Sequence, residues 1–197
     1  AGPSGFTVQS LDSSFAAGDP FMLTRFTFGV HLGTHIDMPS HFLPNEFKAG
    51  NTAEKVDLSR LMGPALVVEV PTGSNITEEV LRGLGVDRGV ERLILKTDNT
   101  ARGLLRRTAF DTSYTALSTS GARYLAEHTQ VKTVGIDYLS IARYSENSDA
   151  HVHVLVAHIM VVEGLVLDEA QPGWYTMACL PLKVAGVEGV PARCVLG

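Results

Sequence analysis

Long hydrophobic runs and blocks of like charge are both absent from this sequence. Although 45% of the 197 residues are hydrophobic, no stretch reaches the ~18 consecutive apolar residues that a membrane-spanning helix requires. Residues 1–5 lack the charged segment and the apolar run of a secretory signal. We therefore expect a soluble, cytoplasmic protein that has no membrane partner.

Cysteine is scarce, and basic residues do not gather anywhere. The two cysteines, Cys179 and Cys194, lack the paired spacing of a zinc knuckle or a redox motif, so we expect two small buried side chains. The formal net charge of -5 comes without a basic run, which excludes the electrostatic footprint of a nucleic-acid-binding protein. A small neutral or weakly charged molecule is the expected partner.

Internal repeats, low-complexity tracts and linkers are also missing, because Gly and Pro are scattered as turn residues. We therefore expect one domain over residues 1–197, which is long enough for a core of ordinary size. Short β-branched runs predict strands at residues 65–70, 93–97, 131–136, 159–162 and 184–187.

Two segments carry helix start signals. Thr77 can cap a helix in residues 75–81, and a second helix is expected in residues 117–127. Each precedes a strand-like run, and such alternation predicts a mixed α/β domain with some parallel pairing. The Phe- and Thr-rich segment 21–28 is more typical of antiparallel β structure, so the fold class is α/β or α+β.

Four side chains with metal-binding or proton-transfer chemistry fall within eleven residues, and all have odd numbers: His31, His35, Asp37 and His41. On a strand they would share one face, but a straight strand would hold His31 and His35 ~13 Å apart, too far to share one ion. The chain must therefore bend between them. Gly33 can adopt a positive φ, and Pro39 makes a second corner. We predict a bent strand that leads into a loop.

Imidazole and carboxylate donors together suit zinc, manganese or iron. The alternative is three separate histidines that cap loops or pack in the core. Because three histidines and one aspartate lie around glycine and proline bends, a metal or catalytic site is the better interpretation.

A second histidine-rich stretch, residues 150–165, is otherwise almost wholly apolar. Glu163 follows a run of apolar residues, and burying its carboxylate would be costly unless a cation or strong donors meet it. Residues 151–158 fit a short helix as well as the start of a strand. At least one of the three histidines in the stretch is expected to be a surface or capping residue; they are His151, His153 and His158.

Together these segments resemble the cyclase-like metal hydrolase family that includes bacterial kynurenine formamidase and isatin hydrolase. The family signature, His-x-Gly-Thr-His-x-Asp-x-Pro-x-His, is present in full as residues 31–41. The resemblance spans most of the chain, up to residues 189–193. The family also has a His twelve residues before Glu-x-Leu, which His151 and Glu163 match. The resemblance therefore favours His151 over His153.

The resemblance implies a metal centre and a fold. His31, His35 and Asp37 would bind a divalent metal, and Asp37 would bridge to a second metal held by His151 and Glu163. The metal would be zinc, or alternatively manganese, with up to two ions per chain. The fold would be a swivelling β/β/α domain with a mixed sheet, and the protein would be a homo-oligomer, a dimer or larger.

Other positions are weaker candidates for the site. The resemblance implies that His41 transfers protons. Two positions depart from the family pattern: the turn that contains Thr97, and Tyr138. Both changes would reshape the substrate pocket. Asp137 follows an apolar strand and can either hydrogen-bond to a ligand histidine or cap a turn.

The leading hypothesis is hydrolysis of a carbon–nitrogen bond in a small amide, an arylformamide or a cyclic amide, by a metal-activated water. His41 would take the proton of the water and return it to the leaving nitrogen. A lactone hydrolase or a biosynthetic, polyketide-type cyclase on the same fold is the alternative within the family. A non-catalytic metal- or small-molecule-binding protein is the alternative from another class.

Overall fold

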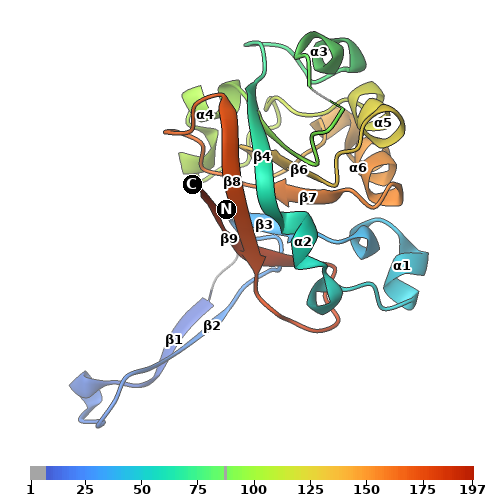
Figure 1. Cartoon of the computed structure of the whole chain (residues 1–197). Coiled ribbons are helices and arrows are strands. Elements are labelled where there is room, and N and C mark those ends of the chain that lie inside the picture. The colour runs from blue at the N-terminus through green and yellow to red at the C-terminus, as the bar shows by residue number, and fades with distance from the viewer. Residues whose placement is uncertain (1–7, 87) are drawn as a thin grey trace.

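Seven strands close into a barrel, which carries the rest of the chain (Figure 1). The computed structural model describes residues 8–86 and 88–197. Around the barrel the strands follow the order β3-β7-β6-β5-β4-β8-β9. Their bounds are β3 His35–Asp37, β4 Met62–Glu69, β5 Arg92–Lys96, β6 Thr133–Ile136, β7 Met160–Glu163, β8 Gly173–Pro181 and β9 Gly189–Leu196.

The barrel has a parallel half and an antiparallel half. Strands β4, β5, β6 and β7 pair in parallel, so each needs a crossover connection to the next. Strand β3 pairs antiparallel with both β7 and β9, and β8 pairs antiparallel with both β4 and β9. The three-residue strand β3 thereby closes the barrel.

Helices cover the outer face of the parallel half. Helix α5 packs against both α3 and α6, on the right-hand side of the barrel in Figure 1. Thr77 caps α3 and Ser118 caps α5, because each side chain accepts a hydrogen bond from a backbone N–H. Among the described residues, no helix has the length and apolar character needed to cross a membrane. The helix bounds are α1 Pro44–Lys48, α2 Leu58–Leu61, α3 Glu78–Gly83, α4 Asp98–Ala101, α5 Thr119–His128 and α6 Asn147–Val156.

Apolar side chains form one cluster on each side of the sheet. Outside the barrel, Leu95 and Ile136 pack in one cluster with Leu125 of α5. The second cluster draws on β3, β4, β5, β7, β8 and β9 and fills the barrel. Strand β6 contributes Gly135 there, where a Cβ would lie 2.7 Å from Ile94 Cδ1. The barrel interior is therefore closely packed around Gly135.

The first two strands stand outside the barrel. β1 (Val8–Ser13) and β2 (Leu23–Thr27) form an antiparallel hairpin that projects toward the lower left in Figure 1. Within the described part of the chain, this hairpin is a separate two-stranded sheet. The prediction of antiparallel structure in residues 21–28 is confirmed.

The predicted mixed α/β fold is confirmed, with two errors in its parts. The strand expected at residues 184–187 is wrong, because these residues lie in the turn between β8 and β9. Neither β8 nor β9 was predicted. Cys179 and Cys194 lie opposite each other on these two strands; Cys179 is buried as expected, but Cys194 is only half-buried and a disulfide joins the two.

Candidate metal centre

The segment 31–41 bends where its sequence predicts. Gly33 has a φ of 59°, a value that favours glycine, and the strand β3 follows directly. Pro39 then begins a single 3-10 turn that ends at His41. The predicted bends at Gly33 and Pro39 are present, but residues 31–34 lie in a loop and only His35–Asp37 form a strand.

The pairing of β3 with β7 brings the two histidine-rich stretches together. His35 lies opposite Glu163 in the register, and its Nε2 is 3.2 Å from Glu163 Oε2. His35 Nδ1 donates to the carbonyl oxygen of Gly33 at 2.9 Å, which leaves Nε2 to face the carboxylates. The same Nε2 lies 3.5 Å from Asp37 Oδ1.

Helix α6 supplies another histidine to the cluster. His151 Nδ1 donates to the carbonyl oxygen of Asn147, one turn earlier, at 2.7 Å. Its Nε2 therefore faces the carboxylates, 3.3 Å from Glu163 Oε1 and 3.7 Å from Asp37 Oδ2. Glu163 Oε1 also accepts a hydrogen bond from the backbone N–H of Ile141 at 2.7 Å. Three segments of the chain thus fix this carboxylate.

The other two histidines of that stretch lie elsewhere. His153 is half-buried on α6, and His158 is exposed beyond the end of the helix with a φ of 54°. Neither lines the cavity that contains His151.

His31 and His41 complete the cluster. His31 Nδ1 is 2.8 Å from Asp37 Oδ1, and His31 Nε2 is 3.4 Å from Glu188 Oε1. The ring of His31 lies against Gly189, where a Cβ would be 2.4 Å from the ring atom Cε1. The ring of His41 is 4.1 Å from that of His31, centroid to centroid. Sequence reasoning missed Glu188, which has no distinguishing pattern around it.

The donor atoms of this cluster fit divalent cations. Ligand atoms of His31, Asp37 and His41 lie within 4.8 Å of one another, and so do those of His35, Asp37 and Glu163. The two carboxylates are 1% and 3% exposed, and burying them costs free energy unless cations offset their charge. Despite the short contacts of Asp37 Oδ1 with His31 and of His31 Nε2 with Glu188, neither buried atom makes a hydrogen bond of good geometry within the described residues. Imidazole nitrogen and carboxylate oxygen are ligands of zinc and manganese.

The carboxylates also control the protonation of the histidines. Burial alone would lower the pKa of His31, His35 and His151, but the nearby carboxylates outweigh it and raise all three, that of His35 to about 9. Burial would raise the pKa of Glu163, whereas its contacts with His151 and His35 lower it. A bound cation would offset the charge of the carboxylates in place of these protons, and the protons would be released when the cation binds.

His41 differs from the other histidines of the cluster. Burial lowers its pKa from the ordinary value, which favours the neutral imidazole at neutral pH. A neutral imidazole can accept a proton.

The cluster lines a cavity of about 680 Å³ whose other walls are largely aromatic. The ring of Phe42 stacks on that of His151 with centroids 4.5 Å apart. Phe110 and Tyr114 come from the segment between α4 and α5, and Tyr144 precedes α6. Sequence reasoning missed these last three residues, because no local pattern ties them to the histidine-rich stretches.

None of the three weaker candidates, Asp137, Thr97 and Tyr138, lines this cavity. Asp137 accepts four hydrogen bonds, from the backbone N–H and the hydroxyl of both Thr97 and Thr100. Of the two alternatives left open for Asp137, these contacts correspond to turn capping. Thr97 is buried and caps α4. Tyr138 is buried as well, and its hydroxyl accepts a bond from the backbone N–H of Asp111.

Comparison with known proteins identifies the family. The family model described as "Putative cyclase" matches residues 6–143. The chain belongs to this cyclase family. Cyclase-like protein 2 of Oryza sativa subsp. japonica is 43% identical over 94% of this chain and 69% of its own length.

Solved structures share the fold. A structure described as a potential metal-dependent hydrolase with cyclase activity superposes with a TM-score of 0.77 at 30% identity, over 95% of this chain and 85% of that one. Isatin hydrolase A from Labrenzia aggregata gives a TM-score of 0.79 over 96% of this chain and 82% of that one. Its identity is only 18%, so this likeness concerns the fold alone. The chain thus has the fold of the cyclase family, which it shares with metal-dependent hydrolases.

Proposed function

We propose that this member of the cyclase family is a metal-dependent hydrolase that cleaves a carbon–nitrogen bond in a small amide, either an arylformamide or a cyclic amide. The observation that carries the proposal is the cluster of histidines around two buried carboxylates, at the wall of a cavity of about 680 Å³. A cavity of this size is typical of a small-molecule site. The related structure described as a potential metal-dependent hydrolase supports the same reaction class.

Five residues would hold the metal. The donors are His31, His35, Asp37, His151 and Glu163. Asp37 belongs to both groups of donor atoms that lie within 4.8 Å of one another, so up to two ions of zinc or manganese fit the proposal. When bound, such a cation supplies a Lewis acid that lowers the pKa of water toward ~7 and polarises a carbonyl group.

His41 would move the proton. Because burial lowers its pKa, its imidazole can accept the proton of the attacking water and return it to the leaving nitrogen. However, His41 also lies in one of the two donor groups, so it is a candidate ligand as well. The two roles predict different metal contents for a variant at this position.

The aromatic walls would position the substrate. Phe42, Phe110 and Tyr114 line the cavity beside the cluster, and such rings favour a flat, largely apolar ligand. An amide attached to an aromatic ring would stack there while its carbonyl group faces the donors.

A second candidate reaction is ring closure or opening of a lactone. The related structure whose description includes cyclase activity favours it, and the same Lewis acid would polarise an ester carbonyl.

We also propose that the protein acts as a homodimer.

The first experiment is to measure metal content per chain by elemental analysis, after purification without chelators or affinity metals. The second is a substrate panel of formanilides, isatin, lactones and β-keto thioesters. About two equivalents of metal with turnover of the amides would support the proposal. A chain that stays empty after incubation with zinc and manganese would contradict it, and turnover of the last two classes alone would favour the second candidate.

The role of His41 is tested by His41→Gln, with His153→Gln as the matched control on the surface of α6. We expect His41→Gln to retain metal and to lose turnover by a factor of about 10² to 10⁴, while the control behaves as the original protein. Loss of metal from His41→Gln would make His41 a ligand, and full activity would remove it from the mechanism.

A further inference from the structure

Two of the three histidines among the proposed ligands have their second ring nitrogen held by a backbone carbonyl group. His35 Nδ1 donates to Gly33 at 2.9 Å, and His151 Nδ1 donates to Asn147 at 2.7 Å. In both rings Nε2 is left to face the carboxylates. A hydrogen bond of this kind fixes the tautomer and the orientation of a ligand histidine. Within the described residues, His31 has no such bond to a carbonyl group.

The ring of His31 has the opposite orientation. Its Nδ1 is 2.8 Å from Asp37 Oδ1, which is close enough for both atoms to bind one cation, since ligand atoms lie about 2.0–2.2 Å from zinc. Its Nε2 lies 3.4 Å from Glu188 Oε1. The structure thus favours Nδ1 as the ligand atom of His31. In a neutral imidazole that binds through Nδ1, the proton is on Nε2, beside the Glu188 carboxylate.

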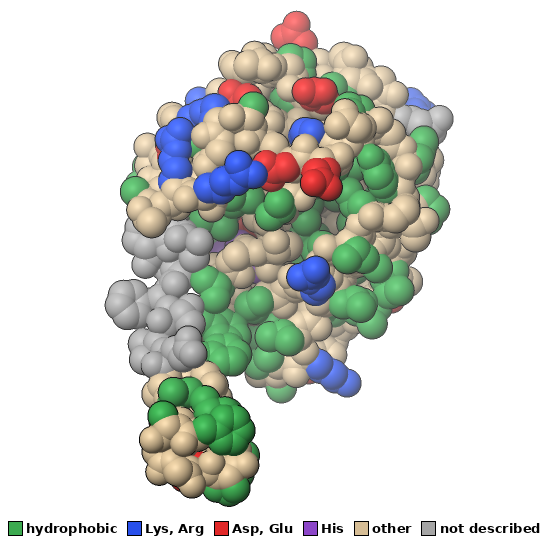
Figure 2. Space-filling view, turned by 90° about the vertical axis from the view of Figure 1, so that its left-hand side faces the viewer, with side chains coloured by type: hydrophobic (Ala, Val, Ile, Leu, Met, Phe, Trp, Pro, Cys, Tyr) green, Lys and Arg blue, Asp and Glu red, His purple; other side chains and the backbone are tan. Residues whose placement is uncertain are grey.

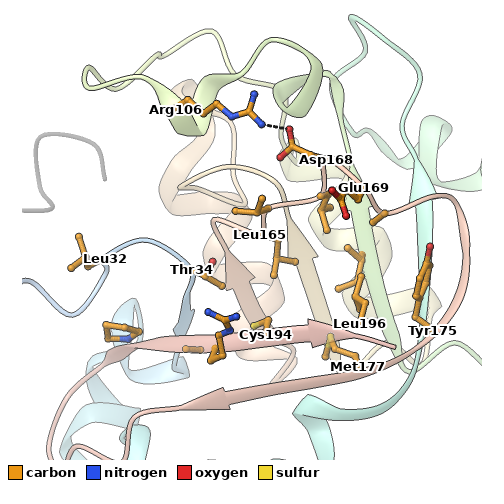
Figure 3. A pocket seen from close by; sticks show the side chains of 17 residues that line it. Leu32, Thr34, Arg106, Leu165, Asp168, Glu169, Tyr175, Met177, Cys194 and Leu196 are labelled. Atoms are coloured by element: carbon orange, nitrogen blue, oxygen red, sulfur yellow. Dashed lines mark hydrogen bonds and ion pairs between the residues drawn. The ribbon is translucent and has the colours of Figure 1, made fainter.

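The backbone around His31 belongs to no helix or strand. Residues 28–34 connect the β1–β2 hairpin to β3, and this hairpin projects from the barrel as a separate sheet, toward the lower left in Figure 2. The neighbours of His31 along the chain face elsewhere, because Leu32 and Thr34 line another cavity, of about 920 Å³ (Figure 3). The position of the His31 ring therefore depends on the groups that touch the ring itself.

The start of β9 supplies several of these contacts. Asp37 pairs with Gly189 in the register of β3 and β9, and Gly189 lies so close to the ring of His31 that a Cβ would clash with it. Glu188 directly precedes Gly189, and its carbonyl oxygen accepts a hydrogen bond from the backbone N–H of Met38 at 2.9 Å. The pairing that places Asp37 at Nδ1 of His31 therefore also brings Glu188 to Nε2.

The turn before β9 is held in place by a second segment. The backbone N–H of Ala53 donates to the carbonyl oxygen of Val187 at 3.0 Å, and that of Gly186 donates to the Glu54 carboxylate at 3.2 Å. The side chain of Glu188 is 36% exposed. It therefore keeps its charge at a lower desolvation cost than the two buried carboxylates of the cluster. A fixed backbone and a half-exposed carboxylate suit a group that orients a neighbouring ring.

We infer that Glu188 is a positioning residue of the metal centre: its carboxylate accepts the Nε2–H of His31 and holds the ring with Nδ1 toward the cation. The inference rests on the metal-dependent function proposed above. At 3.4 Å the contact is longer than a normal hydrogen bond, and a proton on Nε2 would draw the carboxylate closer. Such a partner also makes the imidazole more basic and thus a stronger ligand.

The first test measures zinc affinity by competition with a chromophoric chelator. Glu188→Ala removes the acceptor, whereas Glu188→Gln keeps a side chain of the same length that has a carbonyl oxygen and no charge. We expect zinc affinity to fall about 10- to 100-fold in Glu188→Ala and by a smaller factor in Glu188→Gln. The matched control is Glu54→Gln, which removes a charge that contacts the same turn at Gly186; it should bind zinc as tightly as the original chain.

The second test observes the tautomer of His31 in the zinc-loaded protein. Long-range ¹H–¹⁵N NMR spectra distinguish a protonated ring nitrogen from one that binds a metal, and the variant His31→Gln identifies the signals of this ring. We expect a metal-bound Nδ1 and a protonated Nε2 in the original chain. In Glu188→Ala the Nε2–H signal should shift and exchange faster with water, a change that a purely structural role of Glu188 would not produce.

The outcomes separate this inference from the proposed function. Unchanged zinc affinity in Glu188→Ala, an equal loss in Glu54→Gln, or a metal-bound Nε2 of His31 would each overturn the role of Glu188 and leave the hydrolase proposal standing. A chain that binds zinc but cleaves no amide would refute the hydrolase and leave the role of Glu188 intact. An original chain that binds no zinc would overturn both. Thermal unfolding of the metal-free variants verifies that they remain folded, as expected for a half-exposed position.

Discussion

Replacing Gly189 by alanine is expected to disturb the candidate metal centre through His31, one of the proposed ligands. A Cβ at this position would lie 2.4 Å from Cε1, 2.7 Å from Nε2 and 3.0 Å from Nδ1 of His31. Carbon atoms in contact prefer about 3.5–4.0 Å, so the imidazole must move by roughly 1 Å or more. Metal–ligand distances tolerate deviations of only about 0.2 Å. His31 would then no longer hold the position 2.8 Å from Asp37.

The assay for Gly189→Ala is zinc affinity, measured by competition with a chromophoric chelator. We expect at least about a 10-fold loss, together with a destabilisation of roughly 1–3 kcal/mol from overpacking. Gly83→Ala is the matched control, because a Cβ there meets nothing within 4 Å. Zinc affinity as high as in this control would refute the assignment of His31 as a ligand.

Three further predictions concern stability, measured by thermal unfolding. Asp137→Asn weakens the four hydrogen bonds that hold the turn 97–100 and should cost about 2 kcal/mol, or roughly 4–8 °C in Tm; an unchanged Tm would contradict the capping role. Gly135→Ala places a Cβ 2.7 Å from both Ile94 Cδ1 and Leu165 Cδ1 and should destabilise the barrel by about 1–3 kcal/mol, whereas a neutral effect would mean that the core yields there. Chelator treatment should lower Tm by roughly 5–10 °C relative to zinc at about 100 times its Kd, which corresponds to about 2.7 kcal/mol, and equal values would argue against a bound metal.

The parallel strands could be predicted from sequence, whereas β8 and β9 could not. Parallel strands are covered on both faces and therefore form continuous apolar runs, as β5 and β6 do. Strand β8 is exposed at alternate positions and contains Gly, Thr and Pro, and β9 contains Pro191 and Arg193. The segment 184–187 looked more like a strand than either, because two valines flank its turn residues. Whether these three segments form strands depends on their burial by residues that are distant in the sequence, which local composition does not reveal.

The candidate site was likewise only partly predictable from the sequence. Residues 31–41 carry both the donors and the glycine and proline bends that gather them, so a local segment was enough to predict that half. Local pattern did not choose among His151, His153 and His158. The family resemblance favoured His151 over His153, and in the structure helix α6 turns His151 toward Glu163. Sequence periodicity left helix and strand open there.

The three residues of β3 connect the stability of the barrel to the chemistry of the site. Strand β3 pairs with β7 on one side and with β9 on the other, so the barrel cannot close without placing His35 opposite Glu163. The same closure buries two carboxylates, which costs free energy. Without a metal, the surrounding histidines offset this cost, because their raised pKa keeps them protonated beside the carboxylates. A cation that replaces those protons would stabilise the closed barrel and complete the site in one step. Metal binding and barrel stability should therefore change together in any variant of this strand.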